Sequence, residues 1–157
     1  MPGTTTYETI RDEQIAAIAA IVPTLKADVP FIAAKEHVDF RSWAEKNPQA
    51  ALRRFTVVDL FDENPTEISN YDVEDRRVRA EIVIAYPKTY AYGIDANRDR
   101  RDVIRSDRIA VVNAAGIRGG ANVTRASIYD QDVTVEDGDR VVFLVIEHSI
   151  FFWIDVT

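Results

Sequence analysis

Apolar and polar positions recur along the chain with periods that change from segment to segment, and these periods predict its helices and strands. Over 7–22, large apolar residues recur every three or four positions, which predicts an amphipathic helix. The apolar stripe comprises Ile15, Ile18, Val22 and Leu25. Pro23 is expected to end this helix, because proline lacks an N–H donor and clashes with the preceding turn.

The stretch 24–54 has no clear period and is expected to form an irregular, partly helical insertion between the first helix and the first strand. Asp39 is placed to cap a short helix over 40–46, and Pro48 suits the first position of another helical turn. Three aromatic residues give this segment enough apolar mass to dock on a core: Phe31, Phe40 and Trp43.

Strands are expected next. The stretch 54–61 is rich in β-branched and aromatic residues, whereas 62–75 is typical of a loop because it combines turn residues with acidic side chains. The stretch 77–86 alternates strictly, so one face should be buried and the other should meet water or a partner. The apolar face comprises Val78, Ala80, Ile82, Ile84 and Tyr86, and the charged face comprises Arg77, Arg79 and Glu81.

A second helix is predicted over 96–115, with Asp95 as its N-cap. Gly116 suits the left-handed position that commonly ends a helix. Beyond it, 123–129 and 133–136 are expected to form one interrupted strand.

The last segment follows Asp137-Gly138, a dipeptide that favours a hairpin turn with positive φ. Alternate residues from Val142 to Val156 are apolar, with the exception of His148. Because the alternation keeps its phase, one continuous strand is expected, roughly 50 Å long at about 3.3 Å per residue. Such a strand should extend beyond a small sheet and need another chain to cover it.

The whole chain, 1–157, is therefore expected to be a single α+β domain. Its sheet should be mainly antiparallel with about four strands, two main helices should pack on one face, and the C-terminal strand should be long.

Composition narrows the function classes. The absence of cysteine among the 157 residues excludes a disulfide framework, a thiolate metal site and a cysteine nucleophile. A net charge of −7 argues against a general nucleic-acid binder, which needs a basic surface. No apolar stretch approaches the about 20 residues that span a bilayer, and no signal pattern is seen, so a soluble protein without a membrane partner is expected.

Candidate catalytic chemistry is sparse. The chain has neither a phosphate-binding glycine loop nor a histidine spacing typical of zinc, so no cofactor and no metal are expected. His148 lies on the apolar face of the last strand, where a hydrogen-bonded core or interface histidine is the expected role. His37, beside Glu36 and Asp39, leaves a small acid–base enzyme open as an alternative. Acidic clusters at 62–63, 72–75, 130–132 and 136–139 flank predicted turns, which favours solvated residues over a cation site.

An arginine row on the second helix is the sharpest patterned feature. Arg98, Arg101, Arg105 and Arg108 follow one another at intervals of three, four and three, so they share one helix face. Asp102 can reach Arg98 and Arg105, and Asp99 and Asp107 lie beside the row. The row is a solvated, ion-paired surface, a set of bidentate donors for carboxylates on a neighbouring subunit, or a phosphate or nucleic-acid site. An arginine row and acidic loops on one chain suit a head-to-tail ring.

The chain resembles the tail-terminator and neck-completion proteins of tailed bacteriophages. The likeness lies in the order of the elements and in local texture: the helix over 7–22 ending at Pro23, the strand R-V-R-A-E-I-V-I-A-Y over 77–86, the helix over 95–115, and the long aromatic segment 138–157. The resemblance implies a non-enzymatic subunit without a cofactor that forms a closed ring, usually of six. Such a ring caps the tail tube and joins it to the head–tail connector, with DNA only passing through.

On this resemblance the protein is expected in the virion, at the tail or neck, after assembly in the host cytoplasm. Its expected partners are copies of itself, the tail-tube protein and the connector proteins. The expected subunit contacts are Arg98, Arg101, Arg105, Arg108, Phe151 and Trp153. Two alternatives stay open: the small enzyme around His37, and an adaptor that binds peptides through an exposed sheet edge.

Overall fold

The fold is described from a computed structural model, which covers residues 7–34, 39–60, 64–68, 73–90, 92–93, 96–117 and 126–155. Side chains are described for all of these except 64–68, 73–77, 96, 126–127, 129–130 and 152–155.

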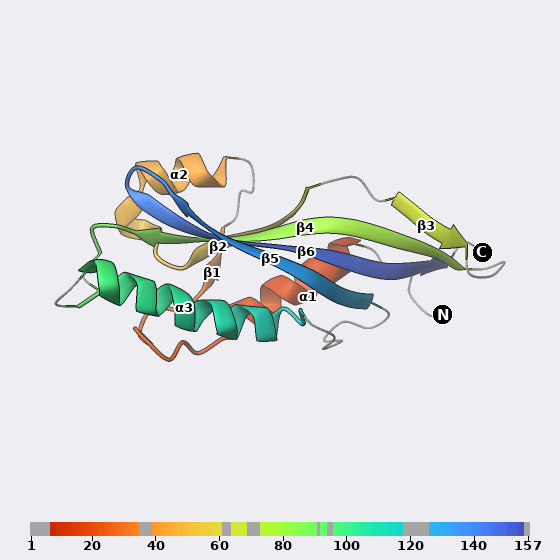
Figure 1. The fold of residues 1–157 in the computed structure, drawn as a ribbon, viewed down its shortest axis with the longest axis horizontal. Coiled ribbons are helices and arrows are strands. Elements are labelled where there is room, and N and C mark those ends of the chain that lie inside the picture. The colour runs from red at the N-terminus through yellow and green to blue at the C-terminus, as the bar shows by residue number, and fades with distance from the viewer. Residues whose placement is uncertain are drawn as a thin grey trace.

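Helices and strands alternate in an α+β arrangement (Figure 1). The helices are α1 (Tyr7–Ala19), α2 (Phe40–Lys46) and α3 (Ala96–Ala114), with a short 3₁₀ turn η1 (Pro48–Ala50) after α2. The strands are β1 (Ile32–Ala33), β2 (Arg54–Asp59), β3 (Asn64–Ile68), β4 (Val73–Pro87), β5 (Ala126–Asp137) and β6 (Val141–Asp155).

The strands form one mixed sheet around a long antiparallel pair. β4 and β6 pair along their whole length, from Val73↔Asp155 to Pro87↔Val141. The order across the sheet is β1-β2-β4-β6-β5. β3 lies off this path and pairs with residues 74–77 of β4, in the part of the sheet called outer here. Every pairing is antiparallel except that of β1 with β2.

The expected sheet of about four strands was therefore incomplete, because β1 and β3 were missed. β1 has two residues, too few to show a period. β3 lies in the stretch 62–75 that was predicted as a loop, and it begins with Asn64-Pro65. Turn residues mislead there because proline is tolerated in an edge strand, whose N–H groups need no partner.

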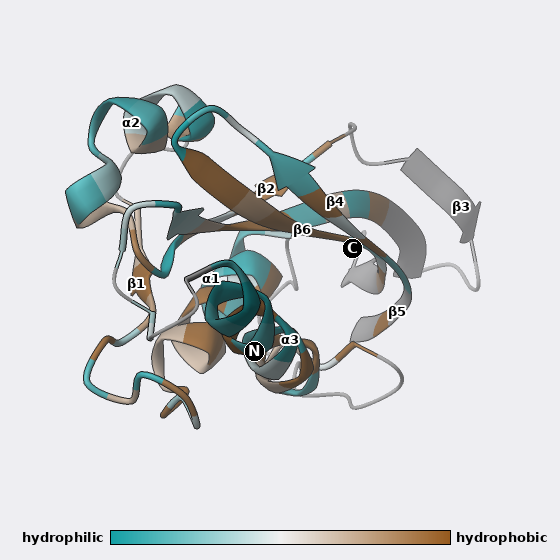
Figure 2. Ribbon diagram, turned by 60° about the vertical axis from the view of Figure 1, so that its left-hand side comes forward, coloured by the Kyte–Doolittle hydropathy of each residue, from teal (hydrophilic) through white to brown (hydrophobic). Residues whose placement is uncertain are grey.

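Helices cover both faces of the sheet in its inner half, which is the end that contains the β5–β6 turn. α1 and α3 lie on one face, as expected for the two main helices, and α2 lies on the other (Figures 1 and 2). The first core joins α1 and α3 to alternate strand residues such as Ile82, Leu144 and Ile146. The second core joins Phe40 and Ala44 of α2 to the intervening strand residues, which are Val83, Ala85, Val141, Phe143 and Val145.

This second core corrects the expectation for the charged face of β4. The apolar face is buried as predicted, from Val78 to Tyr86. The opposite face is not wet in the inner half of the strand, since α2 covers it. There Glu81 is only 8% exposed and lies 3.5 Å from Arg41 of α2. The 24–54 segment, which was expected to be irregular, thus contributes α2, the helix that packs on the second face of the sheet. It also contains β1, so it does not simply precede the first strand as expected.

β6 is one continuous strand, as the unbroken alternation predicted. The inference that another chain must pair with it was wrong for the part of β6 up to Phe152, however. β4 pairs with one edge along its whole length, and β5 pairs with the other edge from Ala126↔Phe152 to Asp137↔Val142. β5 itself is the predicted interrupted strand, with a bulge between Tyr129 and Asp132.

Element boundaries differ in several places. α1 ends at Ala19, and Val22 is 82% exposed rather than part of the apolar stripe. Asp39 makes no side-chain cap bond and has a left-handed backbone, with φ of 60°. Gly116 takes the expected left-handed conformation, with φ of 75°. Gly138 lies in the β5–β6 turn but lacks the positive φ that the dipeptide predicted. The proposed cap Asp95 lies outside the described residues.

Candidate interaction surface

The arginine row forms an exposed face of α3, and its members share that face as their spacing predicted. Arg98, Arg101, Arg105 and Arg108 are all exposed. Ile109 lies next to Arg108 and is 60% exposed, an unusual position for a large apolar side chain. The opposite face of α3 is buried through Val103, Ile104, Val111 and Val112.

Among the ion pairs that the described residues form, the two expected of Asp102, with Arg98 and with Arg105, do not occur. Arg98 lies 3.6 Å from its neighbour Asp99 rather than pairing with Asp102. Among the residues that the structure describes, no carboxylate lies within 4 Å of the guanidinium of Arg101, Arg105 or Arg108. These three cations therefore have no partner in the described part of the chain.

Asp107 does not lie beside the row, because it points into the core. It accepts hydrogen bonds from Arg53 at 2.8 and 2.9 Å, and from the Tyr86 hydroxyl at 2.8 Å. The side chains of Arg53 and Asp107 are 0% and 1% exposed. The other N–H groups of Arg53 bind the backbone carbonyls of Leu25, Lys26 and Val29. All five donors of the guanidinium are thus satisfied.

This buried network fixes α3 on the sheet. It joins α3 to β4 and to the loop after α1, and the Arg53 guanidinium also lies over the Phe31 ring at 5.4 Å. Burial raises the pKa of Asp107, and the hydrogen bonds from Arg53 and Tyr86 lower it again in part. Burial also raises the pKa of Tyr86 well above its ordinary value. The network is structural, because both charges are enclosed and every donor of the cation is used.

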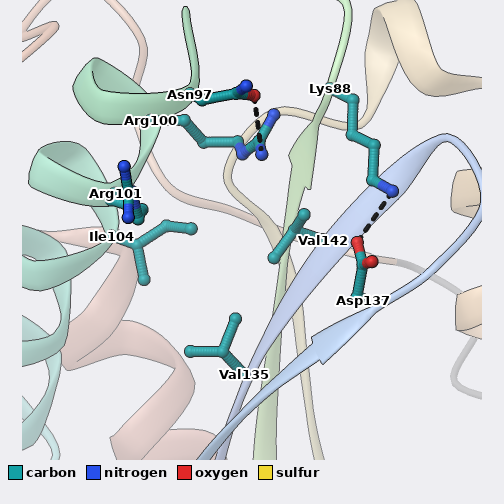
Figure 3. A pocket seen from close by; sticks show the side chains of 8 residues that line it. All are labelled: Lys88, Asn97, Arg100, Arg101, Ile104, Val135, Asp137 and Val142. Carbon is teal, nitrogen blue, oxygen red and sulfur yellow. Dashed lines mark hydrogen bonds and ion pairs between the residues drawn. The ribbon is translucent and has the colours of Figure 1, made fainter.

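A groove lies between α3 and the turn end of β5 and β6 (Figure 3). It has a volume of about 560 Å³. Its lining residues are Lys88, Asn97, Arg100, Arg101, Ile104, Val135, Asp137 and Val142. Arg101 is the member of the arginine row that lines it. The other three members of the row, Arg98, Arg105 and Arg108, do not line it.

The two valines of the groove point from the sheet toward α3, and Arg100 extends from α3 toward the sheet (Figure 3). Arg100 donates to the Asn97 side chain at 3.3 Å, and Lys88 lies 2.7 Å from Asp137. The groove therefore combines an apolar floor with three cations and one carboxylate.

His148 is the hydrogen-bonded core histidine that the sequence predicted. It is fully buried, and its Nε2 lies 3.1 Å from the side-chain amide nitrogen of Gln14, which also donates to the Ala115 carbonyl. Its Nδ1 lies 3.4 Å from the Ile146 carbonyl. Burial lowers the pKa of His148 to about 4, so the ring is neutral near pH 7.

Some of the remaining candidate catalytic or cation-binding residues lie outside the described part of the chain. His37, Asp62, Glu63 and Asp72 lie outside the described residues. Glu136 and Asp137 form ion pairs with Arg41 and Lys88. Within the described ranges, no cluster of three or more potential metal ligands occurs.

The two aromatic residues expected at a subunit contact lie in the outer part of β6. Phe151 is half-buried, and Trp153 is described only by its backbone, which pairs with Asp75.

Comparison of the sequence with protein-family models and with curated proteins gives no match. None of the helices in the described part of the chain combines the length and the apolar character that crossing a membrane requires.

Proposed function

We propose that this chain is a structural subunit of a phage or phage-like particle. In this proposal its copies form a ring at the tail terminus or neck, which caps the tail tube and joins it to the head connector. The resemblance in element order supports the proposal. α1, the strands β2 and β4, α3, and the final pair β5 and β6 follow one another as in that resemblance.

The observation that carries the proposal is the outer end of the β4–β6 ladder. It extends beyond α1 and α3, together with β3 (Figure 1). In this outer part, Phe151, Phe152, Trp153 and Ile154 pair with Arg77, Arg76, Asp75 and Glu74. A run of four large apolar residues at the end of a sheet, most of them aromatic, is typical of a segment that contacts another molecule.

Two exposed arginines of α3, Arg105 and Arg108, support the same proposal. Arg105 and Arg108 lack a carboxylate partner among the described residues, and exposed Ile109 adjoins them. Guanidinium groups next to an apolar side chain are typical of protein interfaces. A net charge of −7 supplies many carboxylates on each copy, and a head-to-tail ring needs two complementary patches on one molecule.

The test is the mass of the protein in solution, alone and with tail-tube protein. Size-exclusion chromatography with light scattering should give a discrete oligomer, or a complex with the tube protein. The double variant Arg105→Glu/Arg108→Glu should weaken that assembly without changing the thermal unfolding midpoint. Arg140→Glu, in the exposed turn before β6, is the matched charge-reversal control and should assemble normally. A monomer at high concentration that also ignores tail-tube protein would contradict the proposal.

A further inference from the structure

The free edge of β5 is the feature that the assembly proposal leaves unused. β5 is the last strand on its side of the sheet, and within the described ranges only β6 pairs with it. The alternative of peptide binding through a sheet edge therefore applies to β5, and not to β6, which has a partner on both edges from Val142 to Phe152 apart from the bulge in β5.

The register shows which groups this edge presents. Gly138 donates its N–H to the Val141 carbonyl, so residue 138 faces β6. In an antiparallel ladder, inward and outward backbone groups alternate from residue to residue. Val133, Val135 and Asp137 therefore turn their N–H and C=O groups away from β6. The same three residues have side chains on the α3 face, because their partners Ile146, Leu144 and Val142 lie on that face.

The groove adjoins this outward edge. Leu144 and Ile146 of β6 are fully buried in the core that α1 and α3 share, whereas Val135 of β5 is 55% exposed. A strand added beside β5 would place every second side chain on the α3 face. Such a side chain would meet the apolar floor at Val135 and Ile104, or the cations of α3.

The charges select the occupant. Lys88 is already paired with Asp137, whereas no described carboxylate lies within 4 Å of Arg100 or Arg101. A guanidinium binds a carboxylate with two parallel hydrogen bonds, and an adjacent apolar floor excludes water from that pair. A basic segment would instead meet like charges, and a wholly apolar one would leave the guanidinium groups unpaired.

We propose that an extended acidic segment of a partner protein adds as a strand to the free edge of β5, beside α3. Its backbone bonds to Val135 and Asp137, one carboxylate binds Arg100 and Arg101, and an aliphatic residue two positions away packs on Val135. This interaction does not depend on the ring, because it uses a groove that Arg105 and Arg108 do not line.

The test uses a fluorescently labelled peptide, S-E-T-V-T-E-T-V-S, which places glutamate and valine on one face of a strand. Fluorescence anisotropy with the full chain should show saturable binding that weakens as salt rises from about 0.05 to about 0.3 M. The counterpart with lysine in place of glutamate should not bind. A counterpart N-methylated at alternate residues cannot donate to a strand edge and should bind at least about tenfold more weakly.

Variants locate the site. Arg101→Glu should weaken peptide binding about tenfold or more, whereas Arg140→Glu should change it less than about twofold. Val135→Pro removes an outward N–H and leaves the ladder to β6 intact, so it should also weaken binding. The thermal midpoint of each variant shows that the fold is retained.

Equal affinity for the glutamate and lysine peptides, or equal effects of Arg101→Glu and Arg140→Glu, would overturn this proposal. It would also be overturned if no peptide bound and Arg101→Glu instead dissociated an oligomer of the chain, since the groove would then be a self-interface. Loss of peptide binding alone would leave the ring unaffected, because the ring is tested through Arg105 and Arg108.

Discussion

Replacing Arg53 by methionine should strongly destabilise the fold, because the substitution leaves a buried carboxylate without its cation. Asp107 would keep one hydrogen bond, from Tyr86, while the carbonyls of Leu25, Lys26 and Val29 would lose their donor. Removing one member of a buried ion pair costs about 3–5 kcal/mol. That cost is a large share of the about 5–15 kcal/mol that stabilises a typical domain.

Urea unfolding followed by circular dichroism measures this loss. With a denaturant dependence of about 2 kcal/mol per molar urea, the midpoint of Arg53→Met should fall by roughly 1.5–2.5 M. A matched control is Arg54→Met, at the neighbouring and partly exposed arginine of β2. This variant should lower the free energy of unfolding by less than about 0.5 kcal/mol.

A double-mutant cycle separates the ion pair from simple packing. Asp107→Leu alone leaves a buried guanidinium and should be about as costly as Arg53→Met. The double variant removes both charges, so its loss should be clearly smaller than the sum of the two single losses. The reasoning would be refuted if Arg53→Met lowered stability by less than about 1 kcal/mol, or if the two single losses simply added.

Three further predictions concern the core. Burial lowers the pKa of folded His148 to about 4 from its usual 6.5, so the unfolded chain binds this proton more tightly than the folded chain does. The free energy of unfolding should therefore fall by about 3 kcal/mol as the pH drops from 6.5 to 4. The variant His148→Gln should show a flatter dependence of the urea midpoint on pH over that range. Gly116→Ala should cost about 1 kcal/mol, since φ of 75° strains a residue with a Cβ, and a thermal midpoint equal to that of the parent would contradict this. Ile82→Ala, in the fully buried centre of β4, should cost about 2–5 kcal/mol by urea unfolding, and a cost below that range would mean that the surrounding core collapses into the cavity.

The segments with a strong period were predictable from the sequence. α3 ends within one residue of its predicted limit, and β6 is continuous as its unbroken alternation indicated. The apolar face of β4 is buried as expected. In these segments the local propensity and the apolar pattern favour the same element, so tertiary packing does not change which element forms.

The missed elements have the opposite character. β3 is a strand despite Asn64-Pro65, because pairing with β4 outweighs its turn residues. The short α2 was predicted with its correct limits, but its place on a second face of the sheet was not. Which face a helix covers depends on contacts distant in the sequence, and a single chain's pattern does not contain them.

The candidate site divides in the same way. Helical spacing predicted that Arg98, Arg101, Arg105 and Arg108 share one face, and the structure shows that this face is exposed. The inward position of Asp107 had a signal as well, since it falls three residues after Ile104 and four before Val111 on the apolar face. Its partner had none, because Arg53 lies 54 residues away and nothing local links the two.

Electron microscopy of the purified protein is the decisive test of the proposed closed assembly. We expect class averages that show rings of one size, formed by the protein alone or on the end of tail tubes. Micrographs without rings at the highest attainable concentration, together with tail tubes whose ends stay bare after mixing, would contradict it.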